Sequence, residues 1–95
     1  MFDTWYDTHR ETAHAWLRDL HRHPETGFEV ARTARFVADR LRDLGYTVAT
    51  GIGGTGVVGT LQGTGQSGRC IAFRAELDAL PMTETAQVDY GRVAV

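Results

Sequence analysis

The feature that most constrains the fold is one amphipathic stretch between Thr26 and Gly45. Its apolar residues recur at helical spacing, and Arg and Asp side chains fill the opposite face. Thr26 and Glu29 have the spacing of a capping box, in which each side chain bonds an amide of the first turn. Gly45 follows the last apolar residue, where a left-handed residue commonly ends a helix. The pattern predicts a helix that begins near Thr26 and ends before Gly45. Its apolar stripe is Val30, Ala34, Val37, Leu41 and Leu44.

A second helix is expected from Asp3 to about Arg22, where apolar residues again fall at helical spacing. Pro24 ends it, because the residue before a proline is pushed out of the α region. Trp5 and Trp16 lie on its apolar stripe, and we interpret them as packing residues rather than a binding site.

Three short stretches after the helices favour strands: residues 46–50, 56–62 and 69–76. The glycine-rich residues 63–68 form a turn, which predicts an antiparallel hairpin of the second and third strands. After Pro81 the pattern fades into a loop, with a short strand at the end. The expected fold class is α/β, with two N-terminal helices packed on a small mixed sheet. Residues 1–95 would form a single partial domain.

Composition excludes several classes of function. A net charge of −2 gives no reason to expect nucleic acid or an anionic membrane as partner. No apolar run approaches the length of a membrane span, and no signal peptide is visible, which predicts a cytoplasmic protein. All ten basic residues are Arg, so neither a Schiff-base lysine nor a P-loop lysine is present. Cys70 is the single cysteine, and we expect it to be a small buried apolar residue rather than a nucleophile.

The third predicted strand ends in alternating charges. Arg74, Glu76 and Asp78 are spaced by two, so their side chains should share one face. The carboxyl ends of strands in α/β sheets are where ligands collect. Neighbouring carboxylates suit a metal, a substrate ammonium group or Arg74 itself. The alternative is an Arg–Glu ion pair at a strand end that meets water.

Two further motifs have weaker functional interpretations. Residues 51–56 satisfy G-x-G-x-x-G, but the β-branched residues that follow do not favour the helix that a dinucleotide site needs. We therefore interpret these glycines as a tight loop between strands. His21 and His23 beside Glu25 offer metal-ligand chemistry. The preferred interpretation is a polar turn next to Pro24 whose side chains cap the helix ends. His9 and His14 are expected to be solvated.

Four blocks together resemble the N-terminus of one family. They are Leu20-His-Arg-His-Pro-Glu25, Leu41-Arg-Asp-Leu-Gly45-Tyr46, Gly53-Gly-Thr-Gly-Val57 and Arg74-Ala-Glu-Leu-Asp78-Ala-Leu-Pro81. In this order they are similar to the M20 metallopeptidase family, in its amidohydrolase branch. The resemblance covers about Trp16 to Tyr90. It implies the N-terminal portion of an M20-type catalytic domain, from a two-domain α/β enzyme that hydrolyses the amide between an acyl group and an amino acid.

The resemblance also assigns site residues. The family motif reads Arg-Ala-Asp-x-Asp-Ala-Leu-Pro, so Asp78 corresponds to the Asp beside the metal site that orients a ligand or the general base. Glu76 replaces the first Asp and is one methylene longer, and Glu84 matches an acid that commonly follows. The family's metal ligands lie in a His-x-Cys-Gly-His-Asp block and further residues that these 95 residues do not contain. No metal ligand is therefore assigned here, although a divalent metal (Zn, Mn, Co or Ni) is implied for the full-length family.

Two hypotheses follow. In the first, the chain is the N-terminal fragment of an amidohydrolase acting on N-acyl amino acids or small peptides, and is inactive alone. In the second, it is a non-catalytic interaction module that pairs with itself or with a full-length relative. The apolar faces at Val57, Val58, Leu61, Ile71 and Phe73 lack enough cover in so short a chain, which predicts marginal stability and self-association.

Overall fold

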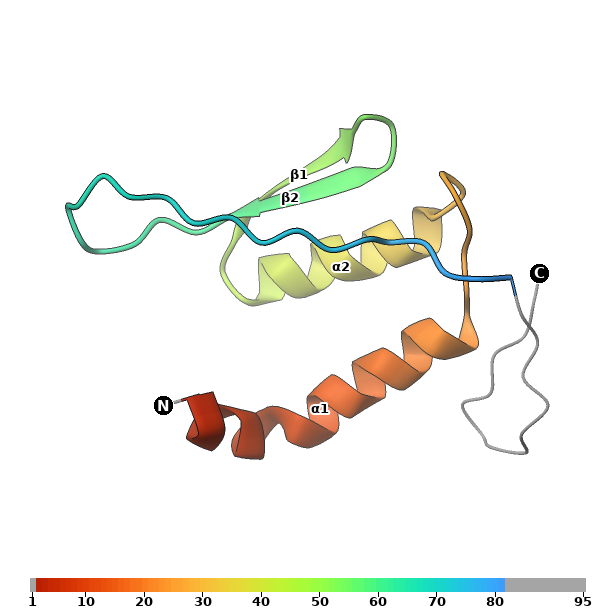
Figure 1. Cartoon of the computed structure of the whole chain (residues 1–95), viewed down its shortest axis with the longest axis horizontal. Coiled ribbons are helices and arrows are strands. Elements are labelled where there is room, and N and C mark those ends of the chain that lie inside the picture. Colours follow the sequence, from red (N-terminus) through yellow and green to blue (C-terminus); the bar gives the residue numbers. More distant parts are fainter. Residues whose placement is uncertain (1, 82–95) are drawn as a thin grey trace. The chain divides into compact units, whose positions relative to one another are not determined.

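The computed structural model describes residues 2–81, which contain two helices and two strands (Figure 1). They are α1 (Phe2–Arg22), α2 (Ala31–Asp43), β1 (Thr47–Ile52) and β2 (Gly56–Thr60). The chain divides into two units, one holding α1 up to Pro24 and the other running from Glu25 to Asp78. Helices combined with a small sheet confirm the predicted α/β class.

The first helix, α1, forms at almost the predicted bounds. It carries Asp3 in its first turn and His21 and Arg22 in its last, which complements the helix dipole at both ends. The helix ends two residues before Pro24, in agreement with the proline rule. Its larger apolar side chains Trp5 and Leu17 are exposed by about half or more.

The N-terminus of α2 differs from the prediction. The helix begins at Ala31 rather than near Thr26, and Val30 at the N-cap makes no side-chain capping bond. Residues 26–29 instead form a turn, in which the Glu29 amide donates to the Thr26 carbonyl (3.0 Å) and Gly27 takes a positive φ of 57°. The capping-box prediction is therefore wrong, because a left-handed glycine within the motif interrupts the helical backbone that a capping box needs.

A residue outside the predicted motif caps α2. The Glu25 carboxylate accepts hydrogen bonds from the backbone amides of Arg32 (3.3 Å) and Thr33 (2.6 Å). These are amides of the first turn, which have no carbonyl partner within the helix. A carboxylate at this end is also favoured by the helix dipole. The turn at residues 26–29 thus reverses the chain direction, which brings the Glu25 carboxylate to the first amides of α2.

The C-terminus of α2 ends as the sequence predicts. Gly45 has a φ of 92°, its amide donates to the Arg42 carbonyl (3.0 Å), and the Tyr46 amide donates to the Leu41 carbonyl (3.0 Å). This pair of bonds is the Schellman motif, which satisfies the last carbonyls of a helix. The chain then enters β1 at Thr47 without a longer loop.

The strands β1 and β2 form an antiparallel hairpin, shown in green above α2 in Figure 1. Thr47 pairs with Thr60 and Thr50 with Val57, and the register shifts between Thr50 and Ile52. The extra residue is Gly51 with a φ of 72°, which is the backbone of a glycine bulge. The G-x-G-x-x-G motif therefore builds a bulge and a turn, and a strand follows it rather than a helix.

The core of the second unit lies where α2 packs against both strands. Val30 is 1% exposed and Ala38 is 3% exposed, and Thr33 is the buried polar residue of α2. Gly59 of β2 allows a close approach, because a Cβ there would lie 3.0 Å from Leu41 Cδ1. This small interior depends on the absence of a side chain at Gly59.

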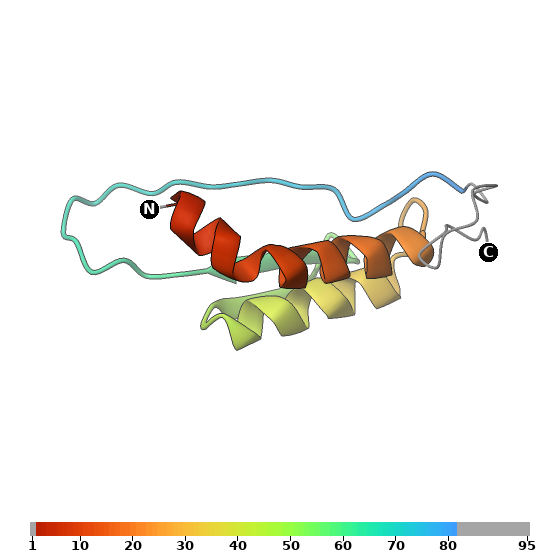
Figure 2. The ribbon, with the colours of Figure 1, turned by 90° about the horizontal axis from the view of Figure 1, so that it is seen from below.

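The predicted third strand is not part of the sheet. Within the described residues the sheet has two strands, and residues 69–76 form no ladder with either. Figure 2 draws this stretch as a trace without an arrow. The prediction of a hairpin between the second and third strands is wrong for this structure, since the hairpin joins β1 to β2. Period-two alternation describes the faces of a strand but does not supply its hydrogen-bonding neighbour. Glu84 and the short strand predicted after Pro81 lie outside the described residues.

Candidate functional site

The strand-end charges come together only in part. Arg74 Nη1 lies 3.8 Å from Glu76 Oε1, so these two side chains share a face as predicted. Their side chains are 85% and 69% exposed, and Asp78 is exposed as well. An ion pair this open to water contributes little to stability. In this structure the cluster is an exposed Arg–Glu pair, which agrees with the alternative interpretation from the sequence.

The glycine loop and α2 border a groove of the second unit. This open groove of about 360 Å³ is lined by small residues of α2 and of the hairpin turn, with Arg35 and Arg42 at its sides. Arg42 forms an ion pair with Asp39, in which Arg42 Nη1 lies 3.5 Å from Asp39 Oδ1. The groove was not predicted from the sequence, because it depends on how α2 packs against the hairpin.

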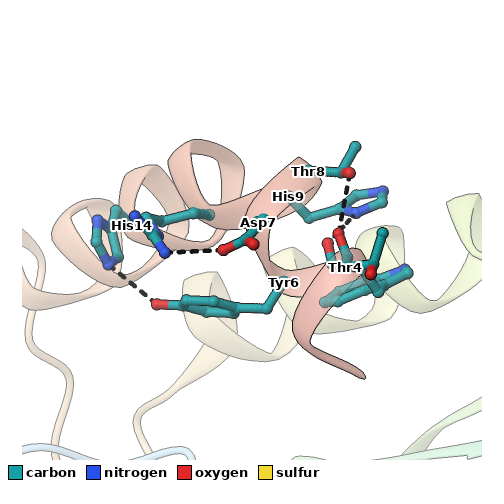
Figure 3. Close-up of polar contacts among 8 residues, drawn as sticks. Thr4, Tyr6, Asp7, Thr8, His9 and His14 are labelled. Atoms are coloured by element: carbon teal, nitrogen blue, oxygen red, sulfur yellow. Dashed lines mark hydrogen bonds and ion pairs between the residues drawn. The ribbon is translucent and has the colours of Figure 1, made fainter. Parts of the chain in front are cut away.

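Two histidines of α1, His9 and His14, make local contacts (Figure 3). His9 Nδ1 donates to the Trp5 carbonyl (2.8 Å), and the two rings stack with centroids 4.2 Å apart. His14 Nε2 and the Tyr6 hydroxyl share a hydrogen bond of 3.4 Å. Asp7 pairs with Arg10 at 3.0 Å. These contacts join residues within three to eight positions on one helix, so they stabilise α1 rather than define a binding site.

The His21, His23 and Glu25 group is not assembled as a metal site. His23 Nδ1 lies 3.0 Å from the Asp19 carbonyl oxygen and 3.5 Å from Asp19 Oδ1, both one turn back on α1. Glu25 is directed to the start of α2. Across residues 2–81, no three His, Cys, Asp or Glu side chains are grouped so that they could hold a metal ion. The residues described therefore do not fit the metal that the family implies.

The surroundings of Glu25 lower its pKa. Burial raises the pKa of Glu25, but hydrogen bonds from the Thr33 hydroxyl and from the amides of Thr33 and Arg32, together with the Arg32 charge, outweigh it and lower the pKa below its usual value. The carboxylate is thus held in its charged form. The interpretation of the His21, His23 and Glu25 group as a polar turn whose side chains cap the helix ends is therefore confirmed for Glu25. The sequence did not indicate which amides Glu25 would reach, because the span of seven to eight residues depends on the intervening turn.

Cys70 is exposed rather than buried as the sequence predicted. It precedes the apolar residues 71–73, and the stretch lacks a sheet neighbour that would cover it. None of the described helices is both long and apolar enough to cross a membrane.

Comparison with known proteins identifies relatives of this chain. It is 45% identical over 71 residues to hippurate hydrolase of Campylobacter jejuni, which aligns 75% of this chain with 18% of that enzyme. It is 43% identical over 70 residues to N-acyl-L-amino acid amidohydrolase of Geobacillus stearothermophilus, covering 74% of this chain and 19% of the enzyme. No protein-family model matches the sequence, and no solved structure matches it significantly.

A third relative carries a different name. A Rhodococcus jostii protein with the provisional name glutamate–cysteine ligase 2-3 is 46% identical over 78 residues, but the match covers only 9% of it. Most of that protein lies outside the aligned part, so its name carries no information about this chain.

The relatives named as hydrolases of amide bonds agree with the four sequence blocks. The chain is thus related to amide hydrolases. It is similar to the N-terminal part of such proteins, in agreement with the resemblance to the amidohydrolase branch of the M20 family. It spans about a fifth of the length of the amidohydrolases that it matches.

Proposed function

We propose that residues 1–95 form the N-terminal part of a metal-dependent amidohydrolase that cleaves the amide of N-acyl amino acids or small peptides. The observation that carries this proposal is the 45% identity to hippurate hydrolase over 71 residues. The similarity to an N-acyl-L-amino acid amidohydrolase supports the same substrate class. A divalent metal (Zn, Mn, Co or Ni) is proposed for the complete enzyme, and a cytoplasmic location remains a prediction.

A polypeptide limited to these residues is proposed to be inactive. Metal-assisted hydrolysis needs a set of ligands with an open position and a base. The described residues assemble no such set, and the carboxylates Glu76 and Asp78 are both exposed. Within the complete enzyme, Asp78 is proposed as a positioning residue beside the metal centre, with Glu76 next to it on the same stretch.

The first experiment assays the purified 95-residue chain. Hydrolysis of hippurate and of N-acetyl amino acids should not exceed the blank, with or without added divalent metal. Chelator-sensitive hydrolysis that Asp78→Ala abolishes would contradict the inactivity of the isolated chain. Asp43→Ala is the matched control, because this exposed acid lies on α2 and pairs with nearby Arg40.

A chimera tests the functional assignment itself. The matched 71 residues of this chain replace their counterpart in Campylobacter hippurate hydrolase. We expect an active chimera in which Asp78→Ala lowers kcat/KM about 10- to 100-fold, as for other groups that orient metal ligands. Glu76→Asp should retain activity, because it restores the residue of the family motif. A folded chimera with equal loss from Asp43→Ala and Asp78→Ala would remove Asp78 from the site.

A non-catalytic interaction role is the second candidate. The observation that favours it is the large exposure of Ile71 and Phe73, which are 81% and 97% exposed. An extended stretch with exposed apolar side chains can pair as a strand with another chain, which would bury those side chains.

A further inference from the structure

Residues 70–78, here named the 70–78 segment, have a strand pattern without a strand partner. Apolar Ile71, Phe73 and Leu77 alternate with charged Arg74 and Glu76. No backbone hydrogen bond joins this segment to the other described residues. Its amides and carbonyls, together with the exposed side chains of Ile71 and Phe73, are therefore available to another strand.

The sequence of the segment is complementary to itself in the antiparallel sense. When two copies are paired about Ala75, Arg74 of one copy lies opposite Glu76 of the other, and this happens twice by symmetry. On the other face Phe73 lies opposite Leu77. Directly opposite side chains in antiparallel strands lie close enough to interact, and opposite charges or apolar pairs there are favourable. A two-fold axis through Ala75 thus satisfies both faces at once.

Other registers lose this match. Centring the pair on Arg74 places two Arg side chains opposite each other. Centring it on Glu76 keeps Arg74 opposite an acid, Asp78, but places two Glu side chains opposite each other and moves Phe73 from Leu77 to Ala79. A shift of one residue between the copies places apolar residues opposite charged ones, because the side-chain period is two. The Arg74–Glu76 contact within one copy shows that both side chains already lie on the same face.

We propose that two copies of this chain associate through antiparallel pairing of their 70–78 segments, centred on Ala75. The occupant of the exposed segment is a second copy. The proposal concerns the 95-residue chain and does not depend on the hydrolase assignment.

Charge exchange tests the register by sedimentation velocity on the purified chain. The unmodified chain should be dimeric at high concentration and dissociate on dilution. Arg74→Glu and Glu76→Arg should each weaken association about tenfold or more, because each creates two like-charge pairs. Mixing the two variants should restore association as a heterodimer. A monomer at all concentrations, or charge variants that associate like the parent, would overturn the proposal.

Cross-linking tests the axis directly. In a Cys70→Ser background, Ala75→Cys places one thiol opposite its copy and should form a disulfide-linked dimer under mild oxidation. Ala72→Cys is the matched control, because its neighbour across the pair is Asp78 rather than its own copy. Both positions are exposed in the single chain. Equal cross-linking at the two positions would overturn the register, and circular dichroism confirms that α2 and the hairpin remain folded.

Discussion

The stretch from Glu25 to Thr60 and the stretch from Leu61 to Asp78 contrast sharply, although both contain strand-forming residues. The first has a capped helix, a paired hairpin and a small interior around Val30. The second exposes Phe73 almost completely and contributes no strand to the sheet. Apolar alternation is present in both, so alternation alone does not make a strand. What differs is a neighbour on which the apolar face can pack.

Burial gives the largest expected difference between the two stretches. Val30→Ala removes two methyl groups from a side chain that is 1% exposed, and should lower the free energy of unfolding by about 2 kcal/mol. Phe73→Ala, at a protein concentration too low for association, should change it by less than about 0.5 kcal/mol. Urea denaturation followed by circular dichroism measures both. Equal effects would mean that Phe73 is covered in solution.

Glycine substitution gives a smaller difference of the same kind. Gly59→Ala would put a Cβ 3.0 Å from Leu41 Cδ1 and 3.2 Å from Tyr46 Cδ2, and should destabilise the unit by about 1 kcal/mol through overpacking. At Gly63 a Cβ would meet no atom within 4 Å, so Gly63→Ala should be neutral or slightly stabilising. Thermal denaturation of the two variants and of the parent measures both changes in stability. A Gly59→Ala protein as stable as the parent would show that α2 and β2 do not approach this closely.

The Glu25 cap should give the smallest effect and a dependence on pH. Because the pKa of Glu25 is lowered on folding, its stabilisation is complete above the usual glutamate pKa and is lost as pH falls through the folded pKa. Glu25→Gln should cost about 0.5–1 kcal/mol at neutral pH. This difference from the parent should shrink in acid. Glu29→Gln, in the turn that lacks a capping box, is the control and should show neither effect; a pH-independent difference for Glu25→Gln would contradict the cap.

The contrast also explains which predictions from sequence succeeded. The helix ends at Arg22 and before Gly45 were predicted because Pro24 and Gly45 act locally on the backbone. The start of α2 was not, because Glu25 reaches Thr33 only across a turn that Gly27 permits.

The candidate site was less predictable than the helices. Spacing correctly placed Arg74 and Glu76 on one face. It could not show that the third strand would lack a partner, since hydrogen-bonding neighbours come from elsewhere in the chain. The roles of Glu76 and Asp78 rest on family similarity and stay predictions.

The Schellman end of α2 has a mechanical consequence. Only residues 44–46 separate α2 from β1, and Gly45 and Tyr46 are tied back to the helix by their amides. So short and hydrogen-bonded a connection can extend very little. A force applied to the hairpin is therefore transmitted to the last turn of α2 and is not absorbed by a loop. Under load, α2 and the hairpin should therefore move as one rigid body. The two hydrogen bonds from the Gly45 and Tyr46 amides to the Arg42 and Leu41 carbonyls hold them together.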